Sequence, residues 1–322
     1  MAAGLSRKEL RGPDMDTRSV IGIDLGGTEI KSVAVRYPDG VTERRETLPT
    51  YDGEFDGDRP VFLRQVSTLI AIHEAHLGES AVACLGLSAP GLAMRSGESI
   101  GFMPGRMAGL EGLHWREALG RQQAVPVLND AHAALMGEIW LGAARGLEDV
   151  VMLTLGTGVG GAIVSGGRLL TGRFGRAGHL GHTTVDYEGV PDLCNTPGSI
   201  EDAIGELTLT KRSNGRFTST EALVAAYAEG DELASKVWLQ SLRALAATIV
   251  SLANAVDPEV VVLGGGITAA GEHLFKPLGQ LVAEREWRPA DAQIELRQAE
   301  LGTWAGAYGA AYHAAQNFQL SH

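Results

Sequence analysis

Two acidic residues, each at the predicted end of a strand, are the first side chains in this sequence that could do chemistry. Asp24 closes the apolar run IGIDL, and the turn Gly26-Gly27-Thr28 follows directly. Glycine lets the backbone approach a ligand closely, so its N–H groups can face a phosphate. Because Mg²⁺ prefers oxygen ligands and keeps several waters, we expect Asp24 to hold Mg²⁺ through water, with Lys31 among the nucleotide-binding residues. An ordinary hairpin with a capping aspartate would explain the same turn.

The second acid is Asp130, which follows Asn129 at the end of the run VPVLN and opens a predicted helix. Aspartate is a good helix N-cap, and this is the plain structural explanation. The functional alternative is that its carboxylate takes the proton of a sugar hydroxyl that attacks the γ-phosphorus of a nucleotide, while Asn129 anchors a neighbouring hydroxyl. We therefore expect Asp130 to be the catalytic base of a phosphoryl transfer.

A second glycine turn lies in LGTGVGGAIV and contains Gly156, Thr157, Gly158 and Gly160. It is not a Walker A loop, since no Gly-Lys-Ser/Thr follows, and it lacks the helix that a dinucleotide fingerprint needs. Gly26 and Gly156 open similar strand–turn–strand units about 130 positions apart, which indicates two related halves. Two such turns facing each other would hold a triphosphate from both sides.

A third glycine element, Gly264-Gly265-Gly266, follows the apolar strand VVVL. Ligands of α/β folds bind at the carboxyl ends of strands, and an adenosine could lie flat on a ledge without side chains. A simple strand-to-helix turn is the alternative. We expect these glycines to contact the nucleotide.

The elements that must position these residues alternate between strands and helices, which is typical of an α/β fold. We expect a first lobe of residues 18–130 and 305–322, a second lobe of residues 131–304, and a disordered polar tail over residues 1–17. The predicted strands are 19–25, 30–36, 81–88, 125–129 and 260–263, with a strand–turn–strand unit over 150–164, and the predicted helices are 61–77, 131–141, 220–228, 232–255 and 304–318.

Composition narrows the classes of function. The 322 residues suffice for two domains, and 27 basic against 39 acidic residues give a net charge of −12, which argues against a broad nucleic-acid surface. We find no run of about 18 apolar residues that would span a membrane. The two cysteines, Cys84 and Cys194, and an N-terminus without the apolar core of a secretory signal indicate the reducing cytoplasm, with Cys84 a buried core thiol.

Seven segments resemble the motifs of the ROK family (repressors, open reading frames and kinases) and occur in the family's order. The similarity runs from Ile21 to about Ala315. It implies a two-lobed actin-like ATPase fold of the hexokinase type, a homodimer, MgATP as the donor, and phosphorylation of a hexose or hexose-like sugar. The segments are DLGGT, LGLSAPG, LNDAHAALMGE, GTGVGGAIV, GRAGHLGHTTVD, PGSIEDAIG and VVLGGGI.

The resemblance also implies roles for single residues. Asp130 takes the place of the family's catalytic base, and Asn129, His182 and Glu201 take the places of sugar ligands. The backbone at Gly91 is expected beside the sugar as well. A neutral imidazole such as that of His182 can both donate to and accept from a sugar hydroxyl, which suits this role.

Two departures concern the sugar pocket. The family's usual Glu-x-Gly-His reads His179-Leu180-Gly181-His182 here, so an imidazole replaces a carboxylate. A carboxylate only accepts hydrogen bonds, whereas neutral histidine has one donor and one acceptor, so the recognition of the sugar must change. Phe102 also stands where the family often has an asparagine that touches sugar. We expect His179 to contact the sugar and the pocket to depart from plain glucose specificity.

The third departure concerns zinc. Many relatives carry a histidine followed by Cys-x-Cys-Gly-x-x-Gly-Cys, and the matching positions here are His182, Asp192, Cys194 and Ser199. A structural zinc site normally takes four cysteine or histidine ligands, and serine is a poor substitute. We therefore expect no structural zinc.

Three other functions, a repressor, a sugar sensor and a serine hydrolase, have weaker support in the sequence. Repressors of the family carry a winged helix-turn-helix before the first glycine strand, and the roughly 20 residues here are too few for one. A non-catalytic sugar sensor of the same fold is the open alternative, although Asp24, Asp130 and both glycine turns together favour an enzyme. The run Gly86-Leu87-Ser88-Ala89-Pro90 only loosely resembles a hydrolase nucleophile elbow, because proline replaces its last glycine.

Overall fold

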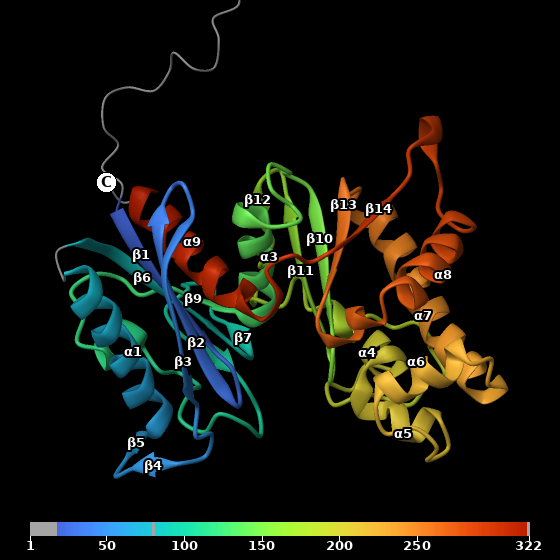
Figure 1. Cartoon of the computed structure of the whole chain (residues 1–322), viewed down its shortest axis with the longest axis horizontal. Helices are drawn as coiled ribbons and strands as arrows, with labels where there is room; N and C mark the ends of the chain where they lie inside the picture. Colours follow the sequence, from blue (N-terminus) through green and yellow to red (C-terminus); the bar gives the residue numbers. More distant parts are fainter. Residues whose placement is uncertain (1–17, 79–80, 321–322) are drawn as a thin grey trace, which may run out of the picture.

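Two α/β lobes, each built on a five-stranded sheet, lie side by side in the computed structural model, which describes residues 18–78 and 81–320 (Figure 1). The predicted tail of residues 1–17 lies outside these ranges. Two helices, α3 (Asp130–Leu141) and α9 (Ala305–Leu320), lie between the sheets. The predicted two-lobed α/β fold is confirmed.

The first sheet has the strand order β3-β2-β1-β6-β9. β1 and β2 form an antiparallel hairpin, while β1, β6 and β9 run parallel, so their carboxyl ends meet at one edge of the sheet. That edge carries Asp24 at the end of β1 and Asn129 at the end of β9. The strands span Arg18–Leu25 (β1), Glu29–Tyr37 (β2), Val41–Pro49 (β3), Val82–Ala89 (β6) and Val127–Asn129 (β9).

The second sheet repeats this plan with the strand order β12-β11-β10-β13-β14. β10 and β11 form the hairpin, and β13 pairs parallel with β10. The repeat predicted from the two glycine turns is therefore present in the fold. The strands span Val150–Leu155 (β10), Val159–Ser165 (β11), Arg168–Leu169 (β12), Val260–Gly264 (β13) and Glu295–Gln298 (β14).

The central helices come very close to each other and to the first sheet, because small residues face the contacts. A methyl group on Gly309 of α9 would overlap the carbonyl oxygen of Ala133 in α3, and one on Gly22 of β1 would overlap that of Ala307. α3 in turn packs on the second sheet through side chains such as Leu135 and Met136. The small residues of the last helix are thus explained by close backbone packing.

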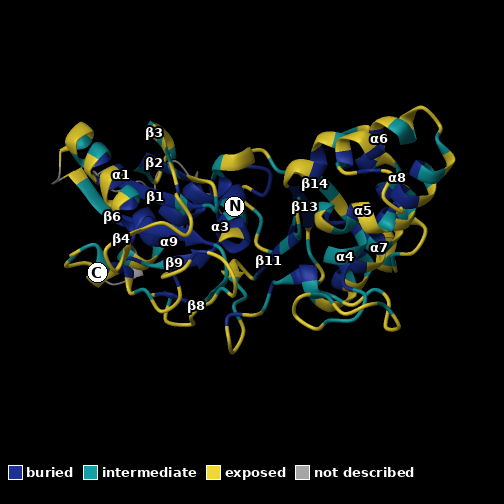
Figure 2. Ribbon diagram, turned by 90° about the horizontal axis from the view of Figure 1, so that it is seen from below, coloured by how far each residue is buried: buried dark blue, intermediate teal, exposed yellow. Residues whose placement is uncertain are grey.

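The outer faces of both sheets are covered by helices, and Figure 2 shows the buried residues concentrated in the two lobes. In the first lobe, α1 (Val61–Leu77) packs with Trp115 over the sheet. In the second lobe, α7 (Glu232–Val256) and α8 (Glu272–Ala283) cover it. The remaining elements are α2 (Trp115–Ala118), α4 (Ile200–Ile204), α5 (Leu209–Arg212), α6 (Thr220–Ala228), β4 (Phe55–Asp56), β5 (Arg59–Pro60), β7 (Leu92–Ala93) and β8 (Ile100–Phe102).

The helix α7 corrects one expectation. An 18-residue window in it has a mean hydropathy of 1.3, so by length and composition alone this helix could cross a membrane. Its apolar face, which includes Trp238, Leu245 and Ile249, is buried in the core of the second lobe. The stretch is a core helix whose periodic polar positions keep it from being a continuous apolar run.

Candidate active site

The first glycine turn lies between β1 and β2, as predicted. Gly26 N–H donates to the carbonyl of Glu29 at 3.1 Å, and Thr50 Oγ donates to the carbonyl of Gly26 at 2.6 Å. Lys31 lies opposite Asp24 in the strand register, and its Nζ lies 3.3 Å from Glu29 Oε2. The turn is therefore closed by its own backbone and held from outside by Thr50.

Asp24 is enclosed at the end of β1. Ser88 Oγ donates to its Oδ1 at 2.8 Å, and Gly306 at the start of α9 leaves space for the carboxylate, because a methyl group there would lie 2.7 Å from Asp24 Cγ. Burial raises the pKa of Asp24 to about 6, the Ser88 hydrogen bond opposes this shift, and the nearby Asp130 adds to it. A cation bound beside Asp24 would therefore stabilise the ionised form of this carboxylate.

Asp130 opens α3 but is not its N-cap, which corrects the plain structural explanation. The cap is Asn129, whose Oδ1 accepts from the N–H groups of Ala131 (3.0 Å) and His132 (3.3 Å). Asp130 is an exposed residue, and desolvation of its carboxylate raises its pKa against the hydrogen bonds from Ala131 and Asn129. Its carboxylate is therefore free of the capping role and more basic than usual.

The side chain of Asn129 is already engaged on both sides. Besides capping α3, its Nδ2 donates to the carbonyl of Gly91 at 2.9 Å. Gly91 has φ of 100°, and a methyl group there would lie 2.6 Å from the carbonyl oxygen of Phe102. Asn129 and Gly91 thus hold the strand end that presents Asp130, and only the second N–H of Asn129 Nδ2 and the remaining oxygen lone pairs are left for a sugar.

The second turn lies between β10 and β11 and contains Gly156, Thr157 and Gly158. Gly160, predicted with them, lies within β11 instead, where a methyl group would lie 3.1 Å from Ala131 Cβ. This contact packs the second hairpin against the first turn of α3. Gly160 therefore serves close packing between the hairpin and the helix that carries Asp130.

Glu201 reaches the same turn. It lies in the first turn of α4, and its Oε2 accepts from Val159 N–H at 2.9 Å. The absence of a side chain on Gly158 makes room for it, since a Cβ there would lie 3.0 Å from Glu201 Cδ. Glu201 is thus tied to the start of β11 through one oxygen.

The third glycine element ends β13. Gly264 is its last residue, Gly265 has φ of 86°, and Gly266 begins a short 3₁₀-helix. A side chain on Gly265 would overlap the backbone of Leu155, next to Gly156. The tertiary structure therefore brings the second and third glycine elements together, as a shared nucleotide site requires.

The segment His179-Leu180-Gly181-His182 packs on α3. The ring centroids of His179 and His132 are 5.4 Å apart, and His132 Nε2 lies 3.0 Å from the carbonyl of Ala177. His179 Nε2 is buried and has no hydrogen-bond partner among the described residues. Burial, and then the neighbouring His182, lower the pKa of His179, so its ring is neutral near pH 7. An unpaired buried nitrogen next to the helix of Asp130 suits contact with a polar ligand.

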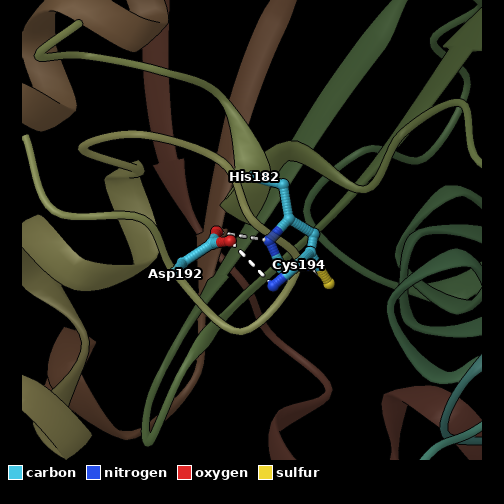
Figure 3. A group of neighbouring side chains, drawn as sticks. All are labelled: His182, Asp192 and Cys194. Carbon is cyan, nitrogen blue, oxygen red and sulfur yellow. Dashed lines mark hydrogen bonds and ion pairs between the residues drawn. The ribbon is translucent and has the colours of Figure 1, made fainter.

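Three of the four positions that match the zinc motif come together (Figure 3). His182 Nδ1 lies 2.7 Å from Asp192 Oδ2, and its Nε2 lies 3.5 Å from Cys194 Sγ. Asp192 Oδ1 accepts the N–H groups of Cys194 at 2.8 Å and Thr196 at 2.9 Å. Ser199, the fourth position, is the N-cap of α4, and its side chain also hydrogen-bonds to Asp192. The side chains of His182, Asp192 and Cys194 form a hydrogen-bonded clamp whose ligand atoms all lie within 4.8 Å of one another.

Three residues beside the site are not among the site residues predicted from the sequence. Ser88 could have been inferred from the register, because the ends of parallel strands meet at one edge. His132 lies two residues after Asp130 in α3, and this place in the helix was its only signal in the sequence. Arg106 had none, because it comes from a loop whose path only the fold determines; a Cβ on Gly27 would lie 2.7 Å from its Nη2.

A cavity of about 1090 Å³ lies elsewhere between the lobes. It is lined by residues such as Arg95, Arg116 and Arg168 and touches His132, but none of the predicted site residues lines it. The predicted site residues instead gather around Asp130, at the start of α3. We place the candidate site there, because the carboxylates, the glycine turns and the unpaired histidine nitrogen gather at that point.

Comparison with known proteins agrees with this arrangement. Residues 20–317 match the model of the ROK family. A glucokinase of Halalkalibacterium halodurans is 33% identical over 92% of this chain and 94% of its own length, and an N-acetylmannosamine kinase of Escherichia fergusonii is 30% identical over 91% and 97%.

Two solved structures are also similar. A ROK hexokinase from Thermus thermophilus has a TM-score of 0.80 and 31% identity, covering 94% of this chain and 99% of that one. A ROK family glucokinase from Streptomyces griseus in complex with glucose and AMPPNP has a TM-score of 0.71 and 26% identity, covering 92% and 99%. With the fold, the paired glycine turns and nearly the full chain matched, this protein belongs to the ROK family.

Proposed function

We propose that this protein transfers the γ-phosphoryl group of ATP to a hydroxyl of a hexose or close analogue, with Asp130 as the general base. The observation that carries the proposal is the position of Asp130: its carboxylate lies close enough to Asp24 for their charges to interact, at the junction of the strand end and α3. The Streptomyces griseus glucokinase, solved with glucose and AMPPNP, supports the same donor and acceptor classes.

The residues fit a magnesium ion. Asp24 lies beside the first glycine turn, and burial raises its pKa, so a bound cation would favour its ionised form. Asp24 would hold Mg²⁺ through water, and the bound ion would neutralise charge on the phosphates of the nucleotide. The backbone N–H groups of the two turns would hold those phosphates, and Gly264 to Gly266 would lie against the adenosine.

The chemical step needs a base and alignment. The acceptor hydroxyl oxygen forms a bond to the γ-phosphorus, the bond between that phosphorus and the bridging oxygen breaks, and ADP leaves with the electron pair. The hydroxyl proton passes to the Asp130 carboxylate. A raised pKa helps here, because a more basic carboxylate takes the proton more readily.

The acceptor class has a second candidate, a 2-acetamido hexose. His179 replaces the carboxylate that is usual at this position, and its buried Nε2 has no partner among the described residues. A neutral imidazole can donate to a carbonyl oxygen, which a carboxylate cannot do. N-acetylmannosamine kinases stand among the relatives at 30% identity. We propose contacts to the sugar from His179, His182, Glu201 and Asn129.

Further parts of the proposal concern the whole chain. We propose lobe limits at 18–130 with 305–322 and at 131–304, lobe closure that excludes water from the transfer, a homodimer, and residence in the cytoplasm where ATP is available. We also propose that the clamp of His182, Asp192 and Cys194 holds no structural zinc. Gel filtration with light scattering tests the dimer.

The deciding experiment measures ADP release with MgATP across hexoses, N-acetylhexosamines, anhydrosugars and cyclitols, with Asp130→Ala beside the wild type. Loss of a general base should lower kcat by about 10²–10⁴-fold while nucleotide binding stays nearly unchanged. Glu98→Ala is the matched control, because Glu98 is exposed in the loop between β7 and β8. A loss below about tenfold in Asp130→Ala with the best acceptor would refute the assignment; acceptor binding without turnover in the wild type would favour the sugar sensor.

A further inference from the structure

The loop after β8 places one arginine over the first glycine turn. Arg106 Nη2 would lie 2.7 Å from a Cβ on Gly27, so the guanidinium lies on the face of the turn that the missing side chain leaves open. The charge of Arg106 also acts on the carboxylate of Asp130, where it opposes the rise in pKa that burial causes. One guanidinium thus lies beside both the expected donor turn and the expected base.

The position of Arg106 is set by its neighbours. Gly105 before it has φ of 77°, and Met107 after it has φ of 53°, a left-handed conformation that is unfavourable for a residue with a side chain. Met107 holds it nevertheless: its side chain is 1% exposed in the core of the first lobe, and its N–H donates to Asp52 Oδ1 at 3.0 Å. Strain of this kind persists where surrounding contacts determine the backbone, and it is common at functional sites.

A second anchor holds the loop at its start. Met103 N–H donates to Glu111 Oε1, and Leu110, fully buried, donates its N–H to the carbonyl of Met107 at 2.9 Å. The loop is therefore fixed on both sides of Arg106, while the side chain of Arg106 itself is exposed to solvent. A loop whose backbone is fixed while its guanidinium is exposed suits a ligand contact better than a structural role.

The charges around the site leave Arg106 available. Lys31, the other cation near the carboxylates, lies within ion-pair distance of Glu29. In residues 18–78 and 81–320, no carboxylate lies within ion-pair distance of the Arg106 guanidinium. Neither glycine turn contains a lysine or arginine of its own. Any cationic side chain that contacts the transferred phosphoryl group beside the magnesium ion must therefore come from outside the turns.

We infer that Arg106 binds the phosphoryl group during its transfer from ATP to the sugar, as a catalytic residue of the reaction proposed above. A planar guanidinium can donate two N–H groups to phosphoryl oxygens and stabilise the charge that spreads over them in the transition state. The inference rests on the proposed kinase function, and it adds a residue from a loop that departs from the usual family sequence.

The test compares Arg106→Ala, Arg106→Lys and the surface control Arg116→Ala with the wild type, using the best acceptor found for the wild type. Loss of one such donor typically lowers kcat by 10²–10³-fold, so we expect a loss of about that size in Arg106→Ala. Arg106→Lys should recover part of it, because it keeps the charge but not the paired geometry. Arg116→Ala should stay within about twofold.

Two further readouts separate the phosphoryl contact from other roles. Binding of MgADP with tetrafluoroaluminate and the sugar should weaken strongly in Arg106→Ala, while binding of MgADP alone and the thermal midpoint stay as in the wild type. If Arg106 acted only on the charge of Asp130, raising the pH would restore kcat of Arg106→Ala; we expect the loss to persist across the pH profile.

Each remaining outcome decides the inference. A kcat loss below about fivefold, unchanged tetrafluoroaluminate binding, or recovery at high pH would overturn it. Absence of acceptor-dependent turnover in the wild type would instead refute the proposed function. A lowered thermal midpoint in both Arg106 variants, with loss of MgADP binding, would assign Arg106 to folding of the loop and so overturn the inference as well.

Discussion

Ser88 Oγ donates a hydrogen bond of 2.8 Å to Asp24 Oδ1, and it joins the carboxyl ends of two neighbouring parallel strands. The pair explains why a serine follows the apolar strand β6 at this point. It also excludes Ser88 as a hydrolase nucleophile, because its hydroxyl donates to a carboxylate without an intervening histidine. The bond stabilises the ionised form of a buried acid whose pKa is otherwise raised.

Replacing Ser88 with alanine should therefore raise the pKa of Asp24 further. We expect the KM for MgATP to increase by about fivefold or more at pH 7 and to recover partly at pH 8.5, where Asp24 is ionised. Steady-state kinetics against MgATP at both pH values measure this. Ser67→Ala on α1, whose hydroxyl only donates to the carbonyl of Leu63, is the control; an equal KM in Ser88→Ala would contradict the role.

A buried histidine far from the site should make the protein sensitive to acid. His73 is fully buried, its Nε2 lies 2.8 Å from Ser32 Oγ, and burial lowers its pKa to about 4. The unfolded chain takes up its proton near pH 6.5, so it binds more protons than the folded protein between about pH 6.5 and 4, and stability falls as the pH drops through this window.

The size of this effect can be measured by urea unfolding at pH 7 and pH 5. His73 should account for about 2 kcal/mol of the stability lost between these values, an order-of-magnitude figure. His73→Gln should show a smaller loss, and His114→Gln, in a loop, should behave as the wild type. Parallel pH dependence in all three proteins would rule out His73 as the source.

The contact between α3 and α9 should tolerate no added atom. Gly309→Ala would drive a methyl group into the backbone of Ala133, so we expect a loss of about 3 kcal/mol or more of unfolding free energy. Gly279→Ala in α8 is the matched control, because nothing lies within 4 Å of the added methyl group. This change should stabilise the protein by up to about 1 kcal/mol, as alanine favours helices over glycine. Thermal and urea unfolding of both variants decide the point.

The proposed sugar contact of His179 should determine acceptor preference. His179→Glu places a carboxylate at this position, and we expect kcat/KM to shift by about tenfold or more towards glucose relative to 2-acetamido sugars, because a buried carboxylate cannot donate to an acetamido carbonyl. Measuring kcat/KM for both sugars in both proteins tests this. His114→Glu serves as control, and an unchanged ratio in His179→Glu would argue against a sugar contact.

The clamp around His182 should hold no structural zinc. We expect protein purified without chelator to contain far less than one zinc per chain, and Cys194→Ser to change the unfolding free energy by less than about 0.5 kcal/mol, since Cys194 is exposed. Elemental analysis and urea unfolding measure these quantities. One tightly held zinc per chain, lost in Cys194→Ser together with stability, would show that three ligands suffice.

The boundaries of the elements followed closely from the sequence. The helix predicted over 61–77 is Val61–Leu77, and the strand predicted over 260–263 ends only one residue later, at Gly264. These elements have strong apolar periods or runs, so local pattern alone determines them. The repeat was visible too, because each half needs its own glycine turn after an apolar strand.

Within the site, the sequence determined residue types and tertiary structure determined partners. Asp24, Asp130 and the glycine turns could be recognised because strand ends and glycines have local signatures. Which of the clustered glycines lie in the turn itself could not be recognised. Gly160 lies in β11, where a methyl group would overlap Thr154 Oγ1 and lie 3.1 Å from Ala131 Cβ. The choice of Asn129 over Asp130 as the cap likewise depends on the backbone angle at the strand end.

The sequence by itself thus determined the fold class and the family, and it singled out Asp24 and Asp130 as candidate acids, since these rest on local periodicity and on motifs in order. Only the tertiary structure decided which groups meet: Ser88 with Asp24, His132 with His179, and Arg106 with Gly27. The physical reason is that such contacts join segments far apart in the chain, and their geometry depends on strand register, helix packing and loop anchoring, which no local pattern encodes.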